Sequence, residues 1–264
     1  MNPLSAFLPH ILALVTLILS VFPAPTNTAP ATGSDVFSRI TRDQVLMLEG
    51  WESTNPRDYD PATITSSSGS VNLIFSGLVS FNPQLELIPE LAESWDISEN
   101  GTVYTFKLRS NARFQDGSAV TAQDFIYSWE RAADPAIASG TVLTYLGDIV
   151  GVREKRQGSA DSISGLKAID EHTLQVTIDA PKPYFLLKLT YPTAYVVNRK
   201  NIESGSDWYR NPVGTGPYRL RDWKSFEYTL LERNDNYYLQ KPSIPYIFIQ
   251  QSTGGLLSYE SSDT

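Results

Sequence analysis

The amino-acid sequence predicts an α/β fold, because strand patterns and helix patterns alternate along the chain. The segment Asp43–Glu49 (DQVLMLE) is a nearly continuous apolar run, as expected of a strand that is covered on both faces. Tyr104, Phe106 and Leu108 recur with a period of two, which is typical of a half-buried strand. A capped helix rich in aromatic residues follows that strand. These three observations together indicate a mixed α/β domain.

The helix pattern is clearest in the stretch DGSAVTAQDFIYSWER. Asp116-Gly117 makes a turn, Thr121 is the expected N-cap, and Asp124 stands where a capping box prefers Glu. Pro135 disfavours helical backbone in the residue before it, so we expect the helix to end near Asp134. One face of this helix carries apolar side chains at the spacing of a core-facing stripe, and Trp129 is predicted to be a core residue: Ala122, Phe125, Ile126, Trp129 and Ala133.

The remaining elements are shorter. After an irregular segment rich in Asn, Asp, Pro and Ser, four apolar residues at helical spacing predict a short helix: Val71, Ile74, Phe75 and Leu78. Further along the chain, residues 166–169 and 174–178 predict a β-hairpin with DEHT at its turn. A second strand pair is predicted at 218–220 with 228–231, a last strand at 246–250, and the beginning of a helix at 253–264.

Composition restricts the class of partner. The chain has 264 residues, of which 41% are apolar, with 5 Trp, 14 Tyr and 11 Phe, so it has enough apolar side chains for a globular core. Its formal net charge is -8 and its basic residues are dispersed. A nucleic-acid partner would require a basic face, so we expect no nucleic-acid binding.

The first residues have the pattern of an export signal. Ile11–Phe22 is an apolar run of the length of a signal-peptide core, and Ala29 with Ala31 suits a cleavage site. We therefore predict a signal peptide over 1–31 and a linker over 32–42, with an uncleaved N-terminal anchor as the alternative. The chain has no cysteine, which excludes disulfides, zinc-thiolate sites and a lipid-modified N-terminal Cys.

Residues for catalysis are sparse. The chain has two histidines, His10 in the predicted leader and His172 in a predicted hairpin turn, and neither has the context of a nucleophile–base pair. The acidic residues lack the spacing of a calcium loop. The GTG at 214–216 is interpreted as a tight turn rather than a phosphate loop. We therefore predict no catalytic residue, no metal and no cofactor, although sequence alone leaves a carboxylate pair possible.

Four segments resemble one family. The strongest is LAESWDISENGTVYTFKLRSNARFQDGSAVTAQDFIYSWERAADP, residues 91–135. The others are NPRDYDPATITSSSGSVNLIFSGLVSFN, GLKAIDEHTLQVTIDAPKPYFLLKLTYPTAYVV and NPVGTGPYRLRDWKSFEYTLLERNDNYYLQKPSIPYI. In this order they resemble the oligopeptide- and dipeptide-binding family (solute-binding family 5) of the extracytoplasmic substrate-binding proteins of ABC transporters. The resemblance runs from about Asp43 to the C-terminus.

The resemblance implies a periplasmic-binding-protein-like fold of type II, cluster C. Members of the family have two α/β lobes that close around a ligand by a hinge motion. On this basis 43–250 is expected to be the first lobe, with a mixed sheet and an inserted α+β subdomain over about 70–180. Residues 251–264 are expected to begin a second lobe. This chain is shorter than members of the family, whose second lobe carries the acidic residue that captures a peptide's amino terminus.

The resemblance also implies ligand-contacting positions. Those just after the D-P of the first loop match Thr65, Ser66 and Ser67, and another, in the loop after the aromatic helix, falls near Thr141 and Val142. These residues are smaller than the family's, so contacts through backbone groups are expected rather than contacts through side chains. Backbone hydrogen bonds ignore side-chain identity, which suits a binder of many peptides.

The function implied is capture of short peptides for delivery to the permease subunits of an ABC transporter, with the full-length protein a monomer. Alternatives remain open at this point. A truncated lobe could serve as a secreted scaffold without transport, a relative could bind a nickel complex, haem or a sugar, and a secreted hydrolase could use a carboxylate pair.

Overall fold

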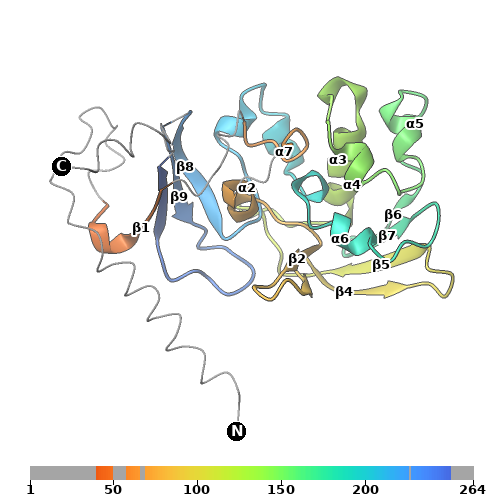
Figure 1. Cartoon of the computed structure of the whole chain (residues 1–264), viewed down its shortest axis with the longest axis horizontal. Helices are drawn as coiled ribbons and strands as arrows, with labels where there is room; N and C mark the ends of the chain where they lie inside the picture. The colour runs from red at the N-terminus through yellow and green to blue at the C-terminus, as the bar shows by residue number, and fades with distance from the viewer. Residues whose placement is uncertain (1–39, 50–57, 66–68, 226, 251–264) are drawn as a thin grey trace, which may run out of the picture. The chain divides into compact units, whose positions relative to one another are not determined.

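Two four-stranded sheets organise the chain in the computed structural model, which describes residues 40–49, 58–65, 69–225 and 227–250 (Figure 1). The strands are β1 (Val45–Glu49), β2 (Val79–Phe81), β3 (Leu87–Pro89), β4 (Ala92–Ile97), β5 (Val103–Leu108), β6 (Leu166–Asp170), β7 (Thr173–Thr177), β8 (Tyr218–Lys224), β9 (Tyr228–Arg233) and β10 (Tyr246–Gln250). The α-helices are α2 (Gly69–Ile74), α3 (Ala122–Ala133), α4 (Val142–Tyr145), α5 (Val152–Arg156), α6 (Phe185–Lys188) and α7 (Arg199–Ile202). Short 3-10 helices are η3 (Arg42–Gln44), η4 (Pro135–Ile137), η5 (Pro192–Ala194) and η6 (Trp208–Arg210).

The first sheet is mixed and has the order β1-β10-β9-β8. β1 pairs with β10 in parallel, with Val45 opposite Tyr246, whereas β10, β9 and β8 pair antiparallel. The second sheet has the order β4-β5-β7-β6 and is antiparallel throughout, and β2 and β3 form a separate hairpin. The second sheet lies within the range 70–180 that is predicted for an inserted subdomain, whose boundaries stay a prediction.

The predicted strand at Asp43–Glu49 is confirmed for Val45–Glu49, but the prediction that it is covered on both faces is wrong for the described part of the chain. Residues 42–44 form η3 instead. Among the described residues, β1 is an edge strand that pairs with β10 alone, and its Leu46 and Met47 are 38% and 54% exposed. An apolar run shows that a strand is hydrophobic, but it does not show whether a second layer covers the strand.

Helix α2 is shorter than its apolar pattern predicted. All four residues of the pattern are buried, but the helix ends at Ile74, so Phe75 and Leu78 lie beyond it. The Ile74 carbonyl accepts a hydrogen bond from the backbone N–H of Gly216 at 2.8 Å. A Cβ at Gly214 or Gly216 would collide with the carbonyls of residues 73 and 74. The GTG segment therefore terminates the helix by close backbone approach, in agreement with its interpretation as a structural turn.

Helix α3 confirms its sequence prediction at both ends. The Asp124 carboxylate accepts hydrogen bonds from the backbone N–H of Thr121 at 2.8 Å and from its hydroxyl at 2.7 Å, so an Asp completes the capping box. The helix ends at Ala133, directly before the residue that precedes Pro135. Its stripe is buried as predicted, except that Ile126 is half-buried. The helix packs against β6 and β7 of the second sheet.

The hairpin prediction is confirmed by β6 and β7, which are joined by a turn that contains His172, and the other predicted strands are confirmed by β8, β9 and β10. The predicted signal peptide, most of the linker and the helix predicted at 253–264 lie outside the described residues.

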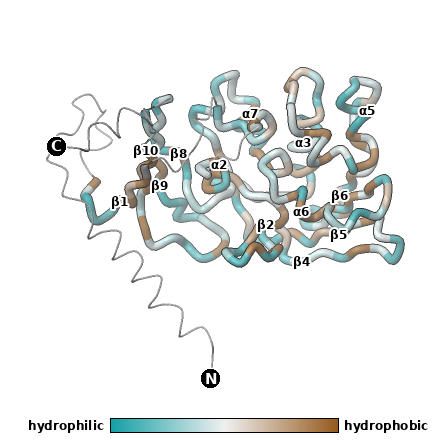
Figure 2. The backbone as a smooth tube through the Cα atoms, in the orientation of Figure 1, coloured by the Kyte–Doolittle hydropathy of each residue, from teal (hydrophilic) through white to brown (hydrophobic). Residues whose placement is uncertain are grey.

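Buried hydrophobic residues form two clusters, one for each sheet. The first cluster contains Trp129, Phe125 and Phe106 and joins α3 to the second sheet. The second cluster contains Tyr59, Ile74 and residues of β9 and β10. Figure 2 shows the hydrophobic stretches of these two strands in brown. Segments that bridge the two clusters are therefore the ones that fix the sheets relative to each other.

Candidate ligand-binding site

The loop over residues 58–65 carries the first predicted ligand-contacting residue and is held by its own side chains. The Asp58 carboxylate accepts hydrogen bonds from the backbone N–H of Asp60 and from the Thr63 hydroxyl, both at 3.0 Å. Tyr59 is fully buried, and its hydroxyl lies 2.7 Å from that of Thr229 in β9. The loop is therefore a defined turn that is anchored on the first sheet.

The second predicted segment follows α3 and η4. The hydroxyl of Thr141 lies 2.6 Å from that of Thr193 in η5, and both residues are buried. Arg156 donates hydrogen bonds of 3.3 Å to the backbone carbonyls of Asp134, Pro135 and Ser139. This network fixes the path of the chain from the end of α3 to the start of α4.

The structure brings the two segments together. A Cβ built at Gly140 would lie 3.5 Å from Cγ2 of Thr65, which is ordinary van der Waals contact. Thr65 and Gly140 are both exposed, whereas Thr141 is 9% exposed and Val142 is fully buried. The side chain of Val142 packs in the first core cluster, so only its backbone can contribute to a surface site. Ser66 and Ser67 lie outside the described residues.

An ion pair links the loop over residues 58–65 to helix α3, which precedes the second segment. Arg131, in the last turn of α3, donates to both carboxylate oxygens of Asp60, at 2.9 and 2.6 Å. Their side chains are 12% and 9% exposed, respectively. The Arg131 guanidinium also lies 5.4 Å from the centre of the Trp208 ring. The sequence analysis missed this pair, although a charged residue close to the apolar stripe of α3 was an available signal.

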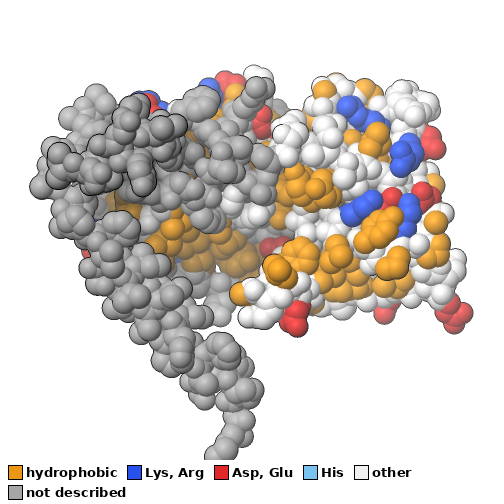
Figure 3. Space-filling view, viewed as in Figure 1, with side chains coloured by type: hydrophobic (Ala, Val, Ile, Leu, Met, Phe, Trp, Pro, Cys, Tyr) orange, Lys and Arg blue, Asp and Glu red, His pale blue; other side chains and the backbone are white. Residues whose placement is uncertain are grey.

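Exposed hydrophobic side chains lie on α4, which follows the second segment, and at α6 and the residue before it. Leu143 is 43% exposed, and Tyr184 and Leu187 are 49% and 48% exposed. Figure 3 shows hydrophobic side chains gathered over the region of α6, with basic side chains beside them. The ammonium group of Lys188 lies 5.1 Å from the centre of the Tyr184 ring. This surface can contact apolar groups of a ligand or of another protein.

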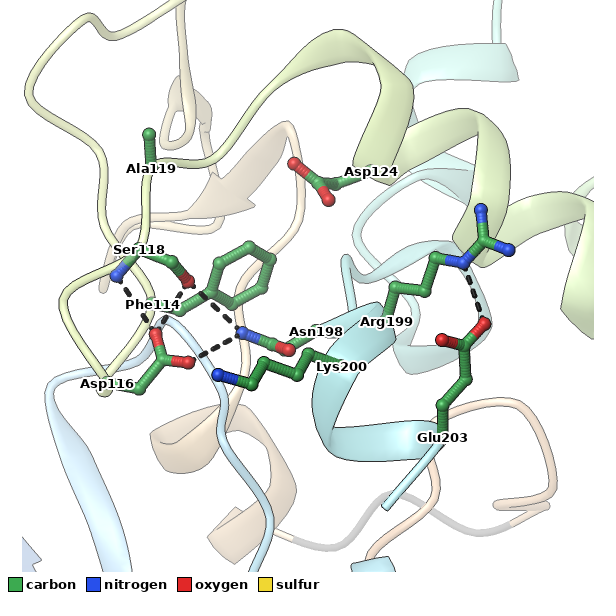
Figure 4. A pocket seen from close by; sticks show the side chains of 9 residues that line it. All are labelled: Phe114, Asp116, Ser118, Ala119, Asp124, Asn198, Arg199, Lys200 and Glu203. Atoms are coloured by element: carbon green, nitrogen blue, oxygen red, sulfur yellow. Dashed lines mark hydrogen bonds and ion pairs between the residues drawn. The ribbon is translucent and has the colours of Figure 1, made fainter. Parts of the chain in front are cut away.

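A surface depression of about 640 Å³ contains none of the predicted site residues. Figure 4 shows its lining, in which Asp116 points toward Ser118 and Asn198 while Arg199 turns to Glu203. Burial alone would raise the pKa of Asp116, but hydrogen bonds from Ser118 and then Asn198 outweigh it and hold that pKa below its usual range. Both oxygens of the Asp116 carboxylate thus accept hydrogen bonds from neighbouring donors.

The described residues contain no group of three or more His, Cys, Asp or Glu side chains placed to hold a metal ion. Within the same part of the chain, no helix has the length and apolar character needed to cross a membrane. His172 is half-buried in the turn between β6 and β7. The arrangement suits binding through backbone and hydroxyl groups.

Comparisons with known proteins identify the family. The sequence model of the bacterial extracellular solute-binding proteins, family 5 (middle), matches residues 86–253. The chain is 37% identical over 216 residues to the periplasmic oligopeptide-binding protein OppA of Escherichia coli, covering 79% of this chain and 39% of that protein. It is 31% identical over 212 residues to the dipeptide-binding protein DppE of Bacillus subtilis, covering 78% and 38%. The chain thus spans about two fifths of the length of these relatives.

Solved structures agree. The Escherichia coli murein tripeptide binding protein MppA superposes with a TM-score of 0.77 at 28% identity, over 84% of this chain and 44% of that chain. Listeria monocytogenes OppA bound to peptide gives 0.75 at 30% identity, over 85% and 46%. The predicted α/β fold of type II periplasmic binding proteins is therefore confirmed. The chain belongs to the bacterial extracellular solute-binding proteins, family 5.

Proposed function

We propose that this chain contributes one lobe of the extracytoplasmic substrate-binding component of a peptide ABC transporter. In this role it captures short peptides and presents them to the permease subunits in the membrane. The observation that carries the proposal is the close approach of Thr65 to Gly140, which directly precedes Thr141 in a separate part of the sequence. The family resemblance assigns Thr65, Thr141 and Val142 to ligand contact. Catalysis is not part of the proposed role.

The proposed contacts are made by Thr65, Ser66, Ser67, Thr141 and Val142. Because Val142 is fully buried and the Thr141 hydroxyl bonds to Thr193, backbone groups are proposed to contact the ligand at this second segment. The N–H groups of Thr141 and Val142 donate to the Ser139 hydroxyl at 3.4 and 3.2 Å, so a ligand acceptor would replace Ser139 there. An extended peptide backbone can pair with such groups whatever its side chains are. The exposed Leu143 directly after them supplies an apolar contact for a ligand side chain.

One lobe alone should bind weakly. A ligand enclosed between two lobes loses water on both sides and forms hydrogen bonds on both sides, whereas a single lobe leaves one side of the ligand solvated. Calorimetric titration of di- to pentapeptides against residues 35–264, and against the longest natural form of the protein, tests this. We expect micromolar binding, about -8 kcal/mol, for the longer form and much weaker binding for residues 35–264.

Two outcomes contradict parts of this proposal. Micromolar binding by residues 35–264 would show that this lobe has a self-sufficient site. Failure of every form to bind peptides, with binding of a nickel complex, haem or a sugar in the same titration, would replace the peptide with another solute.

Export is part of the proposal. The apolar run Ile11–Phe22 and the alanines at 29 and 31 support a signal peptide that is removed near Ala31, and the absence of cysteine supports a protein without a lipid-modified Cys. N-terminal sequencing of the exported protein tests this. Intact Met1 in a membrane fraction would favour the uncleaved anchor.

A further inference from the structure

We propose that the ion pair between Asp60 and Arg131 is a positioning clamp, which sets the loop segment over residues 58–65 against the segment at Gly140. Neither residue is proposed to touch the ligand. The inference rests on the proposed function for its consequence on peptide binding, but its geometric part concerns this chain alone.

The pair has the geometry in which arginine differs most from lysine. Two N–H groups of Arg131 meet the two oxygens of Asp60 at 2.9 and 2.6 Å, so the planar fork fixes orientation as well as distance. Asp60 is 6% exposed, and its Oδ1 also accepts the backbone N–H of Ala62 at 3.0 Å. The carboxylate thus holds both the helix and the turn of its own loop.

The neighbours of Arg131 restrict it further. Its guanidinium lies 5.4 Å from the ring centre of Trp208, which is itself 9% exposed. A cation above an indole ring is attracted by the negative face of the ring, and this attraction strengthens where water is excluded. Arg131 is therefore held between η6 on one side and the loop over residues 58–65 on the other.

The loop bridges the two cores at this point. Tyr59 belongs to the core cluster of the first sheet and bonds to Thr229 there, whereas the next residue, Asp60, bonds to α3, which packs on the second sheet. Five residues after Asp60, just past the buried Ile64, the loop reaches Thr65, whose Cγ2 would lie 3.5 Å from a Cβ built at Gly140. The direction of the loop at Thr65 thus depends on both anchors.

The second segment starts from the same helix. Asp134 follows α3, and its backbone N–H bonds to the Arg131 carbonyl at 3.0 Å before η4 leads to Gly140. Arg131 therefore contacts the first segment through its side chain and begins the second through its backbone. A change that lets the side chains of Asp60 and Arg131 separate will widen the spacing at Thr65 and Gly140.

The test uses the absence of native cysteine. The pair Thr65→Cys and Gly140→Cys introduces two thiols at exposed positions. A Cβ built at Gly140 lies 3.5 Å from Cγ2 of Thr65, a spacing that suits a disulfide. The rate of disulfide formation is measured in a fixed glutathione buffer in three backgrounds: unchanged, Asp60→Asn and Arg131→Lys. Arg131→Lys keeps the positive charge and removes only the fork.

A matched control is available in Asp148. Its carboxylate is 7% exposed and bonds to Lys182 and Lys188 at 2.7 and 2.6 Å, so Asp148→Asn also breaks a partly buried ion pair. We expect disulfide formation to slow by at least about tenfold in Asp60→Asn and Arg131→Lys, and to change by less than about twofold in Asp148→Asn. Circular dichroism confirms that each variant is folded at the temperature used.

The same variants then report on function. In the longest natural form, the dissociation constant for a tripeptide is expected to rise about tenfold with Asp60→Asn or Arg131→Lys and to stay unchanged with Asp148→Asn. Disulfide rates equal to the unchanged background in both clamp variants would overturn the inference, as would unfolding of both, because the pair would then serve the whole fold. Slower disulfide formation in a protein that binds no peptide would instead refute the proposed function and leave the clamp standing.

Discussion

The indole nitrogen of Trp129 donates a hydrogen bond to the backbone carbonyl oxygen of Ala194, 2.9 Å away and 65 residues later in the chain. Trp129 is fully buried, and its ring meets that of Phe125 edge-on with centroids 6.0 Å apart. The bond ties α3 to η5, whose Thr193 in turn contacts Thr141. A residue predicted for the core by its spacing thus also supports the candidate site.

Replacing this side chain should be costly. Trp129→Ala is expected to lower the free energy of unfolding by about 3–5 kcal/mol, because it leaves a large cavity and an unpaired carbonyl. Urea denaturation followed by circular dichroism measures the change. Trp95→Ala, at a half-buried position on β4, is the control and should cost less. A loss below about 1 kcal/mol for Trp129→Ala would contradict its role in the core.

Glu90 should make stability depend on pH near neutrality. Burial raises the pKa of its carboxyl to about 7, against the opposing effects of the Ser76 hydroxyl, the Gly77 backbone and Arg109. In the unfolded chain the pKa of this carboxyl is about 4.3, so at pH values between the two pKa values the folded state holds a proton that the unfolded state has lost. The contribution of Glu90 is therefore fully present below the unfolded pKa and is lost as pH rises through about 7.

The direction of this pH dependence can be measured directly. The free energy of unfolding is expected to fall by an amount on the order of 2 kcal/mol between pH 5 and pH 8, and Glu90→Gln should flatten that part of the profile. Denaturant titrations at several pH values provide both curves. An identical pH slope in the Glu90→Gln variant would show that another group titrates.

Leu85 has the left-handed backbone conformation, which a Leu side chain rarely adopts. It has a φ of 62°, and its side chain is 79% exposed. The turn is imposed by Asn82, whose side-chain oxygen accepts the backbone N–H groups of Gln84 and Glu86 at 3.0 and 2.9 Å. Left-handed backbone is unfavourable for Leu and tolerated by Asn.

Leu85→Asn should therefore stabilise the protein. We expect a gain of about 0.5–1 kcal/mol in the free energy of unfolding, measured by thermal or urea denaturation. Gln84→Asn, one residue earlier and without a positive φ, is the control and should change stability little. A loss of stability in Leu85→Asn would show that its apolar side chain stabilises the hairpin by contacts that exceed the backbone strain.

Asp148 should contribute stability that acid removes. Burial alone would raise its pKa, but hydrogen bonds from Lys182 and Lys188 outweigh it and hold the pKa below the usual value of an Asp. A carboxyl with a depressed pKa stabilises the fold above the unfolded pKa, and this contribution is lost as pH falls through the folded value. Asp148→Asn is expected to cost about 2 kcal/mol at pH 7 and less at pH 3. Equal costs at both pH values would contradict this assignment.

The sequence by itself determined the elements whose causes are local. Thr121 and Asp124 begin α3 and Pro135 limits its end, because capping and proline geometry act within a few residues. The hairpin of β6 and β7 follows from alternating residues around a short turn. The family, and with it the fold, was also recoverable from sequence, since four segments carry its pattern in order.

Only the tertiary structure decided what depends on distant partners. In the described chain β1 pairs only with β10, 201 residues away, and α2 ends at Ile74, where Gly216 bonds to its last carbonyl. The same holds at the site. No local pattern shows that Thr65 meets Gly140, that Val142 is buried, or that Asp60 pairs with Arg131 across 71 residues. Packing between the two cores sets these contacts, and packing energy depends on which surfaces meet rather than on the order of residues along the chain.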